Sequence, residues 1–226
     1  MNKKRIYIVR HGEAEGNVQG FSQTDTTPLT ETGEKQASIV ADRCKALPIE
    51  AVYASRMRRA QQTAAHLAKL ANIDVVETEY FHEFTKPSSV QMLPHEDEAY
   101  QVYAKAEKES YADSNWRYED GETFADIRKR VEAGLTFLEE CPYSHIALVS
   151  HGRLIQFMVA YVLHNQQLSA AVEQQLAERM VVTNTGITVF EYDQDVWKLI
   201  TFNDFAHFAE ELWNCFSSDM GKPMAT

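Results

Sequence analysis

The feature that most constrains the fold of this chain is an alternation of short apolar runs with longer segments of helical periodicity. Residues 5–9, 51–54 and 145–150 are apolar runs without polar alternation, a pattern typical of strands that are buried on both faces of a sheet. Residues 124–140 repeat apolar side chains at i, i+4 and i+7, which predicts an amphipathic helix. Strands that alternate with helices predict an α/β fold, here a three-layer α/β/α sandwich with a mainly parallel central sheet.

The rest of the chain continues this alternation. Thr30 is a candidate helix N-cap, and the acidic residues after it suit the positive end of a helix that runs to Leu47. Further helices are expected over 59–70, 153–163 and 206–216, and further strands over 74–78, 187–192 and 197–202, of which the last two form an antiparallel pair.

Between residues 87 and 121 the composition shifts toward acidic and aromatic side chains. We interpret this stretch as a partly helical cap that is inserted into a single domain over residues 1–226. The length suits one large domain or two small ones, and one domain is the simpler interpretation. Its aromatic residues are expected mainly to pack the cap onto the domain.

Charge and cysteine content exclude several classes of partner. The net charge of −11 opposes general binding to nucleic acid or anionic lipid. No apolar stretch is long enough to cross a membrane, and the basic N-terminus is interpreted as the start of a first strand, not as a signal peptide. The three cysteines are widely spaced and odd in number, which indicates reduced thiols and a cytoplasmic protein.

Polar residues follow each of the three buried strands. Arg10-His11-Gly12 follows the first, residues 55–59 follow the second, and Ser150-His151-Gly152 follows the third. The carboxyl ends of parallel strands meet at one edge of a sheet, where α/β proteins place their ligand sites. Guanidinium groups match phosphate oxygens, an imidazole can act as a nucleophile, and a helix after Gly152 would add backbone N–H groups. Any one histidine here could be an ordinary core residue, but their joint occurrence predicts an anion site.

These motifs resemble the histidine phosphatase superfamily, also called the phosphoglycerate mutase-like family. Arg10-His11-Gly12-Glu13 matches the hallmark Arg-His-Gly-Glu of that family. Residues 28–37 match its Pro-Leu-Thr-x-x-Gly-x-x-Gln-Ala, and residues 55–64 match its Ser-x-x-x-Arg-Ala-x-Gln-Thr-Ala. Shorter matches are residues 121–124 with Arg130-Val131, residues 149–152 and residues 184–186, so that the resemblance covers roughly residues 5 to 208.

The resemblance implies that His11 is a nucleophile that becomes phosphohistidine. It also implies that Arg10, Asn17, Arg59 and His151 hold the phosphoryl oxygens, to which Gly152 contributes through its backbone. The register of the match over residues 55–64 selects Arg59, not Arg58, as the phosphate-binding arginine. Two arginines beside His11 should disfavour its imidazolium form and keep the attacking nitrogen free.

The resemblance further implies that Glu83 is the general acid and then the general base, because an alkoxide leaves poorly without a proton. Glu13 is the competing carboxylate. His82-Glu83 begins like a zinc-protease motif, but Lys86 stands where the second histidine would be, so no metal is expected. The sequence has neither a Gly-x-x-x-x-Gly-Lys loop nor a dinucleotide-binding fingerprint, so no other cofactor is expected.

Three functions compete: a phosphatase, a mutase and a catalytically dead binding module. The binding module is disfavoured because every residue that the chemistry needs is present. Residues 84–88, which follow Glu83, resemble the phosphatase branches of the family more than the mutases, which have a Gly-containing stretch there. We therefore expect a metal-independent phosphatase that acts on small phosphorylated metabolites, as a monomer or homodimer. The alternatives are a cofactor-dependent phosphoglycerate mutase and a protein phosphohistidine phosphatase.

Overall fold

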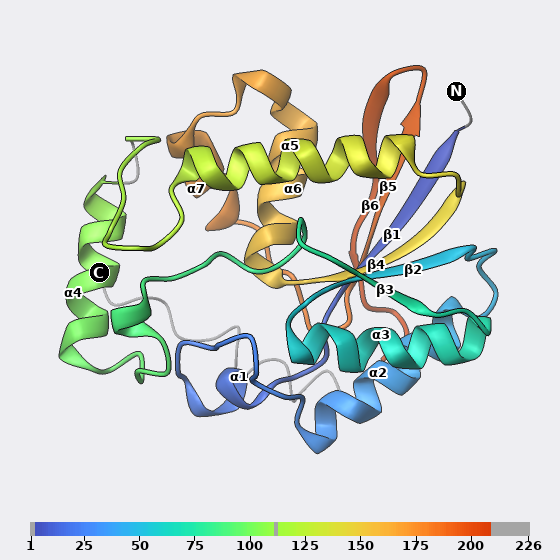
Figure 1. Ribbon diagram of the computed structural model, residues 1–226, viewed down its shortest axis with the longest axis horizontal. Helices are drawn as coiled ribbons and strands as arrows, with labels where there is room; N and C mark the ends of the chain where they lie inside the picture. Colours follow the sequence, from blue (N-terminus) through green and yellow to red (C-terminus); the bar gives the residue numbers. More distant parts are fainter. Residues whose placement is uncertain (1–2, 111–112, 209–226) are drawn as a thin grey trace.

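A computed structural model describes residues 3–110 and 113–208 of the chain, which are arranged around one six-stranded sheet (Figure 1). The strand order is β3-β2-β4-β1-β5-β6. The first four strands of this order are mutually parallel, and β5 runs antiparallel to both of its neighbours, β1 and β6, which confirms the mainly parallel sheet. The strands are β1 (Lys4–Arg10), β2 (Ala51–Ser55), β3 (Val75–Thr78), β4 (His145–Ser150), β5 (Ile187–Asp193) and β6 (Val196–Asp204).

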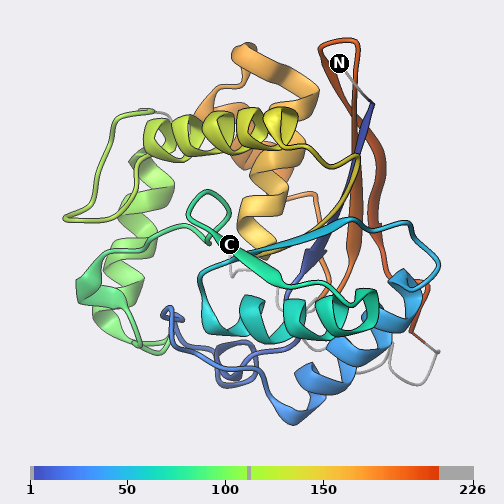
Figure 2. The same cartoon turned by 45° about the vertical axis from the view of Figure 1, so that its right-hand side comes forward.

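Helices cover both faces of the sheet, which completes the three predicted layers. The helices α2 (Glu31–Cys44) and α3 (Arg58–Ala71) lie on one face, and α5 (Phe124–Glu140) and α6 (Gly152–His164) lie on the other (Figures 1 and 2). The short helix α7 (Ala170–Ala177) packs beside α6 and was not predicted.

Successive residues of β1 alternate between two apolar cores, as the pleat of a strand requires. Ile6 and Ile8 are fully buried in the core that contains the apolar residues of α5 and α6. Tyr7 and Val9 are buried in the other core, with the apolar residues of α2 and α3. This burial on both faces explains why the sequence of β1 is a continuous apolar run.

The helix that was predicted to reach Leu47 ends earlier, at Cys44. Its start is as expected, because the Thr30 side chain accepts a hydrogen bond from the backbone N–H of Gly33. Pro48 prevents the helix from continuing to the predicted end, because it has no backbone N–H to donate to the carbonyl oxygen of Cys44 and it disfavours the helical conformation at Leu47.

Part of the segment between β3 and α5 lies outside the three layers, on the left of Figure 1. It contains a 3₁₀ turn, η1 (Ser88–Val90), and the helix α4 (Glu98–Ser110). Tyr103 is buried there, with its ring 6.1 Å from that of Tyr100 and 5.4 Å from that of Tyr118. These aromatic side chains therefore pack against one another.

The helix predicted over 206–216 lies only partly within the described residues, of which 206–208 form a turn.

Within the parts of the chain that are described, no helix is both long and apolar enough to span a membrane.

Candidate active site

The three predicted strand ends meet in space because β2, β4 and β1 are neighbours in the sheet. Arg10, the last residue of β1, is the register partner of Ser150, the last residue of β4. The backbone N–H of His11 then donates to the carbonyl oxygen of Ser150 at 2.9 Å. Side chains that follow these strands are thereby brought to one edge of the sheet.

His11 is buried and its two ring nitrogens have different roles. Nδ1 lies 2.6 Å from the carbonyl oxygen of Gly12, which can only accept a hydrogen bond, so Nδ1 carries the proton. Nε2 accepts a hydrogen bond from Nε of Arg59 at 3.2 Å. Burial, and next the charges of Arg59 and Arg10, hold the pKa of His11 well below its usual value. The imidazole is therefore neutral, with its lone pair on Nε2.

His151 lies beside His11, with 5.1 Å between the ring centroids. Its Nε2 is 2.8 Å from Oγ of Ser55, while its buried Nδ1 has no hydrogen-bond partner among the described residues. Burial, followed by the charge of Arg59, holds the pKa of His151 well below its usual value. A second neutral imidazole thus borders the site.

Arg59 lies in the first turn of α3 and is buried, whereas its neighbour Arg58 is exposed. Nη1 of Arg59 donates to the carbonyl oxygen of Thr24 at 2.9 Å. Burial lowers the pKa of Arg59 to about 10, and the negative charge of Glu83 partly opposes this shift. A guanidinium with this pKa stays charged at neutral pH, so the site keeps its cation.

Arg10 lies against the first residue of α6. Its Nη1 donates to the carbonyl oxygen of Val182 at 2.5 Å. A Cβ atom added to Gly152 would lie 3.3 Å from Nε of Arg10, a tighter contact than is usual. Glycine at position 152 therefore lets the N-terminus of α6 approach the arginine.

A turn that precedes β5 holds the backbone of residues 10 and 11. The carbonyl oxygen of His11 accepts a hydrogen bond from Nδ2 of Asn184 at 3.0 Å, and that of Arg10 accepts one from the backbone N–H of Thr185 at 3.0 Å. Thr185 has φ of 55°, an unusual conformation for a β-branched residue. The sequence resemblance included residues 184–186 but gave them no role.

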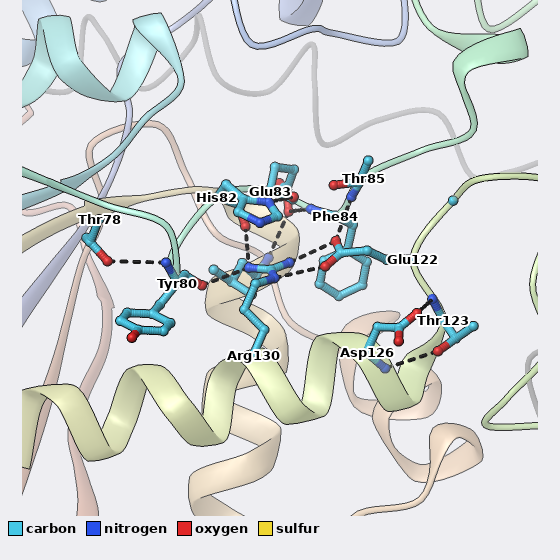
Figure 3. Close-up of polar contacts among 12 residues, drawn as sticks. Thr78, Tyr80, His82, Glu83, Phe84, Thr85, Glu122, Thr123, Asp126 and Arg130 are labelled. Atoms are coloured by element: carbon cyan, nitrogen blue, oxygen red, sulfur yellow. Dashed lines mark hydrogen bonds and ion pairs between the residues drawn. The ribbon is translucent and has the colours of Figure 1, made fainter.

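Glu83 occupies the N-terminus of α6. Its Oε1 accepts hydrogen bonds from the backbone N–H groups of Phe84 and Leu154, each at 3.0 Å, and its Oε2 accepts one from that of Arg153 at 3.1 Å (Figure 3). A carboxylate is favoured at this positive end of a helix. Because His151 is the N-cap of the same helix, Glu83 lies close to the histidine pair.

The competing carboxylate, Glu13, is engaged elsewhere. Its Oε1 accepts a hydrogen bond from Oγ1 of Thr30 at 2.6 Å, at the start of α2. Asn17 lies in the short helix α1 (Glu15–Gln19), where its Oδ1 accepts from the backbone N–H of Ala14 at 3.0 Å. Among the described residues, no hydrogen bond joins Asn17 to His11 or to either arginine of the site.

Comparisons with known proteins identify a family and a fold for this chain. Residues 6–205 match the family model described as the histidine phosphatase superfamily (branch 1). A probable phosphoglycerate mutase, GpmB, of an Enterobacter species is 32% identical over 202 residues, which are 85% of this chain and 87% of that protein. A solved structure of a putative alpha-ribazole-5'-P phosphatase from Escherichia coli has a TM-score of 0.76 at 24% identity, with 90% and 97% of the two chains covered. A phosphoserine phosphatase from Entamoeba histolytica has a TM-score of 0.74 at 24% identity, with 91% and 100% covered, and both likenesses concern the fold.

Proposed function

Because the chain belongs to the histidine phosphatase superfamily, we propose that it is a phosphatase that hydrolyses small phosphate monoesters through a phosphohistidine on His11. One observation carries this proposal: the imidazole of His11 is buried and neutral, and the guanidinium groups of Arg59 and Arg10 lie beside it. The chain as a whole is acidic, with a net charge of −11. The local positive charge is what an anionic phosphate needs to bind.

In the first step Nε2 of His11 attacks phosphorus. An N–P bond forms as the P–O bond to the alcohol breaks, and the alcohol oxygen takes a proton from Glu83. In the second step Glu83 accepts a proton from water, the water oxygen attacks phosphorus, and the N–P bond breaks to release inorganic phosphate. Glu83 is thereby returned to its protonated form, so that protons balance over the cycle.

The phosphoryl oxygens would be held by Arg10, Arg59, His151 and Asn17, with the backbone N–H of Gly152 at the helix N-terminus. Arg59 Nε, which bonds Nε2 of His11 in the structure, transfers its hydrogen bond to a phosphoryl oxygen when substrate binds. Charge on a transferring phosphoryl group spreads over its outer oxygens, so donors held in place before the reaction stabilise the transition state. This set supplies positive charge without a metal ion, and we propose that the reaction requires none.

Glu83 can serve as the acid and base despite its hydrogen bonds to the backbone. A carboxylate has about four lone-pair positions, and three are used by the N–H groups of Phe84, Arg153 and Leu154. One position is left for the proton.

Phosphoglycerate mutase is the second candidate, because the Enterobacter relative is named a probable one. A mutase uses the same first step and then returns the phosphoryl group to a bound sugar acid instead of water. The names of the two structural neighbours, an alpha-ribazole-5'-P phosphatase and a phosphoserine phosphatase, favour hydrolysis.

The test is a panel of phosphate esters assayed for phosphate release in the presence of EDTA, with 3-phosphoglycerate isomerisation measured alongside. The proposal expects phosphate release that exceeds isomerisation and persists in the chelator. Isomerisation that outpaces hydrolysis would overturn the choice of phosphatase. Activity that is lost in EDTA and restored by zinc or magnesium would overturn metal independence.

A further inference from the structure

Glu122 and Arg130 form a shielded ion pair that no step of the proposed reaction uses. Nε and Nη2 of Arg130 donate to the two carboxylate oxygens of Glu122, each at 2.9 Å. The side chains are only 12% exposed for Arg130 and 17% exposed for Glu122. A two-point pair of this kind fixes the orientation of both groups, and it is much less screened by solvent than a surface pair.

The third nitrogen of Arg130 holds the chain on the N-terminal side of Glu83. Nη1 donates to the carbonyl oxygens of Tyr80 and His82, at 2.8 and 2.9 Å (Figure 3). These residues belong to an irregular segment after β3, so no sheet hydrogen bonds fix their backbone. Together with Oγ of Ser150, which donates to the carbonyl oxygen of Phe81 at 2.9 Å, Arg130 therefore supplies the contacts that a strand would otherwise receive from its neighbour.

Glu122 holds the chain on the C-terminal side of Glu83. Its Oε2 accepts a hydrogen bond from the backbone N–H of Thr85 at 2.8 Å, and its own backbone N–H donates to the carbonyl oxygen of Thr85 at 2.9 Å. The ion pair thus forms hydrogen bonds to the backbone on both sides of Glu83, within three residues in each direction.

The helix α5 fixes the positions of Glu122 and Arg130. Thr123 and Asp126 form a capping box that fixes the start of α5, directly after Glu122. Arg130 lies one turn further along this helix, and its neighbour Val131 is fully buried in the same core as Phe81. The position of the segment is therefore set by a packed helix.

We infer that Glu122 and Arg130 are positioning residues that hold Glu83 where its carboxyl group meets the leaving oxygen. This inference rests on the proposed function. Neither residue touches the substrate; both act through the backbone around Glu83. Weakening the pair should therefore reduce proton transfer to the leaving group and leave the phosphate-binding pocket intact.

The experiment compares two conservative variants with a matched control. Arg130→Lys removes the two-point fork but keeps the charge, and Glu122→Gln removes the charge but keeps an acceptor for Thr85. The control is Arg128→Lys on the same helix, which weakens a more exposed ion pair with Glu132. Each protein is assayed on p-nitrophenyl phosphate and on the alkyl ester that the wild type hydrolyses fastest, with vanadate inhibition as a measure of the pocket.

We expect both variants to lower kcat on the alkyl ester by about 10- to 100-fold, the size of effect that a misplaced catalytic group produces. The rate of the first step with p-nitrophenyl phosphate, vanadate inhibition and the control should change little, because a nitrophenolate leaves largely unaided. Equal slowing of both esters, no slowing of either, or failure of both variants to fold would make the pair merely structural and overturn the inference. A wild type that hydrolyses no ester would instead reject the proposed function, and the inference with it.

Discussion

Nε of Arg59 lies 3.2 Å from Nε2 of His11, so a guanidinium N–H rests on the lone pair that the imidazole would use in attack. The adjacent Arg58 is exposed and begins the same helix. Neighbouring arginines thus have opposite environments, and only one of them faces the histidine.

This contrast predicts that Arg59→Ala lowers kcat/KM by about 10²- to 10³-fold, because it removes a preset donor to the phosphoryl oxygens. Arg58→Ala should leave the rate nearly unchanged, since its side chain faces solvent. Steady-state assays of both variants on one phosphate ester check this. Comparable losses would mean that the phosphate does not bind at Arg59.

Replacement of His11 by alanine should abolish both turnover and covalent labelling. A phosphohistidine is labile in acid and stable in base, so wild-type protein treated with a ³²P-labelled ester and quenched in base should retain the label. The His151→Ala variant serves as a comparison, because it keeps the nucleophile and should still take up label slowly. Label that survives in His11→Ala would place the nucleophile elsewhere.

At Gly33, the first turn of α2 lies in close contact with the backbone of the loop that carries His11. A Cβ atom added to Gly33 would lie 2.0 Å from the carbonyl oxygen of Glu13, a backbone atom that cannot turn aside. Gly33→Ala should therefore lower the free energy of unfolding by about 1–3 kcal/mol and also reduce activity, as the loop is displaced.

The control for this prediction is Gly20→Asn. Nothing lies within 4 Å of a Cβ atom at Gly20, and asparagine tolerates its φ of 67°. Urea unfolding of both variants measures the difference. A Gly33→Ala protein as stable and active as the wild type would show that the helix α2 and the loop with His11 can move apart at little cost.

Much of the fold could be predicted because local signals and long-range packing agree. The helix α5 has the predicted bounds, since an apolar stripe coincides with a capping box at Thr123. The helix α1 was missed because it has only five residues and its N-cap is Ala14, which has no side chain able to cap a helix. Neither length nor capping distinguishes such a helix from a loop.

The site was predictable where its residues follow parallel strands, because the topology of the sheet then brings them together. The contacts of Asn184 and Arg130 were not predictable on that basis. Asn184 reaches His11 from a turn 173 residues away, and Arg130 reaches the carbonyl of Tyr80 from a helix 50 residues away. Such contacts depend on how irregular segments cross one another, and sequence periodicity carries no information about that.

The two buried histidines predict how stability depends on pH. Burial, and then the charge of Arg59, holds the pKa of both His11 and His151 well below the usual value of about 6.5. As the pH falls below about 6.5, the unfolded chain binds protons at these residues and the folded protein does not. The free energy of unfolding should therefore fall on acidification, by up to about 1.4 kcal/mol per pH unit for each histidine, and it should be independent of them at higher pH.

Urea unfolding between pH 7.5 and 5 checks this dependence. The variant His151→Gln should show a shallower slope than the wild type below about pH 6.5, because one of the two groups is gone. His164→Gln changes an exposed residue at the end of α6 and serves as the control. Equal slopes for the wild type and His151→Gln would contradict the assignment of a neutral buried imidazole.

The proposed role of Glu83 predicts that the rate loss caused by its replacement depends on the leaving group of the ester. An alkyl alkoxide needs a proton as the P–O bond breaks, whereas a nitrophenolate leaves largely unaided. Glu83→Gln keeps the shape of the side chain, and its amide oxygen can still accept a bond at the N-terminus of α6, but it has no proton to transfer. It should slow alkyl ester cleavage by about 10²- to 10⁴-fold and slow the first step with p-nitrophenyl phosphate much less.

The same variant should also accumulate phosphohistidine, because Glu83 would activate the water that hydrolyses it. Rapid mixing with p-nitrophenyl phosphate should then show a burst of nitrophenol that approaches one equivalent per site, followed by slow turnover. Glu13→Gln is the matched control, since Glu13 is bonded to Thr30 at the start of α2 and should show neither effect. Equal slowing of both esters by Glu83→Gln, without a burst, would leave Glu83 with only its structural role at α6. A burst in Glu13→Gln would transfer the assignment to Glu13.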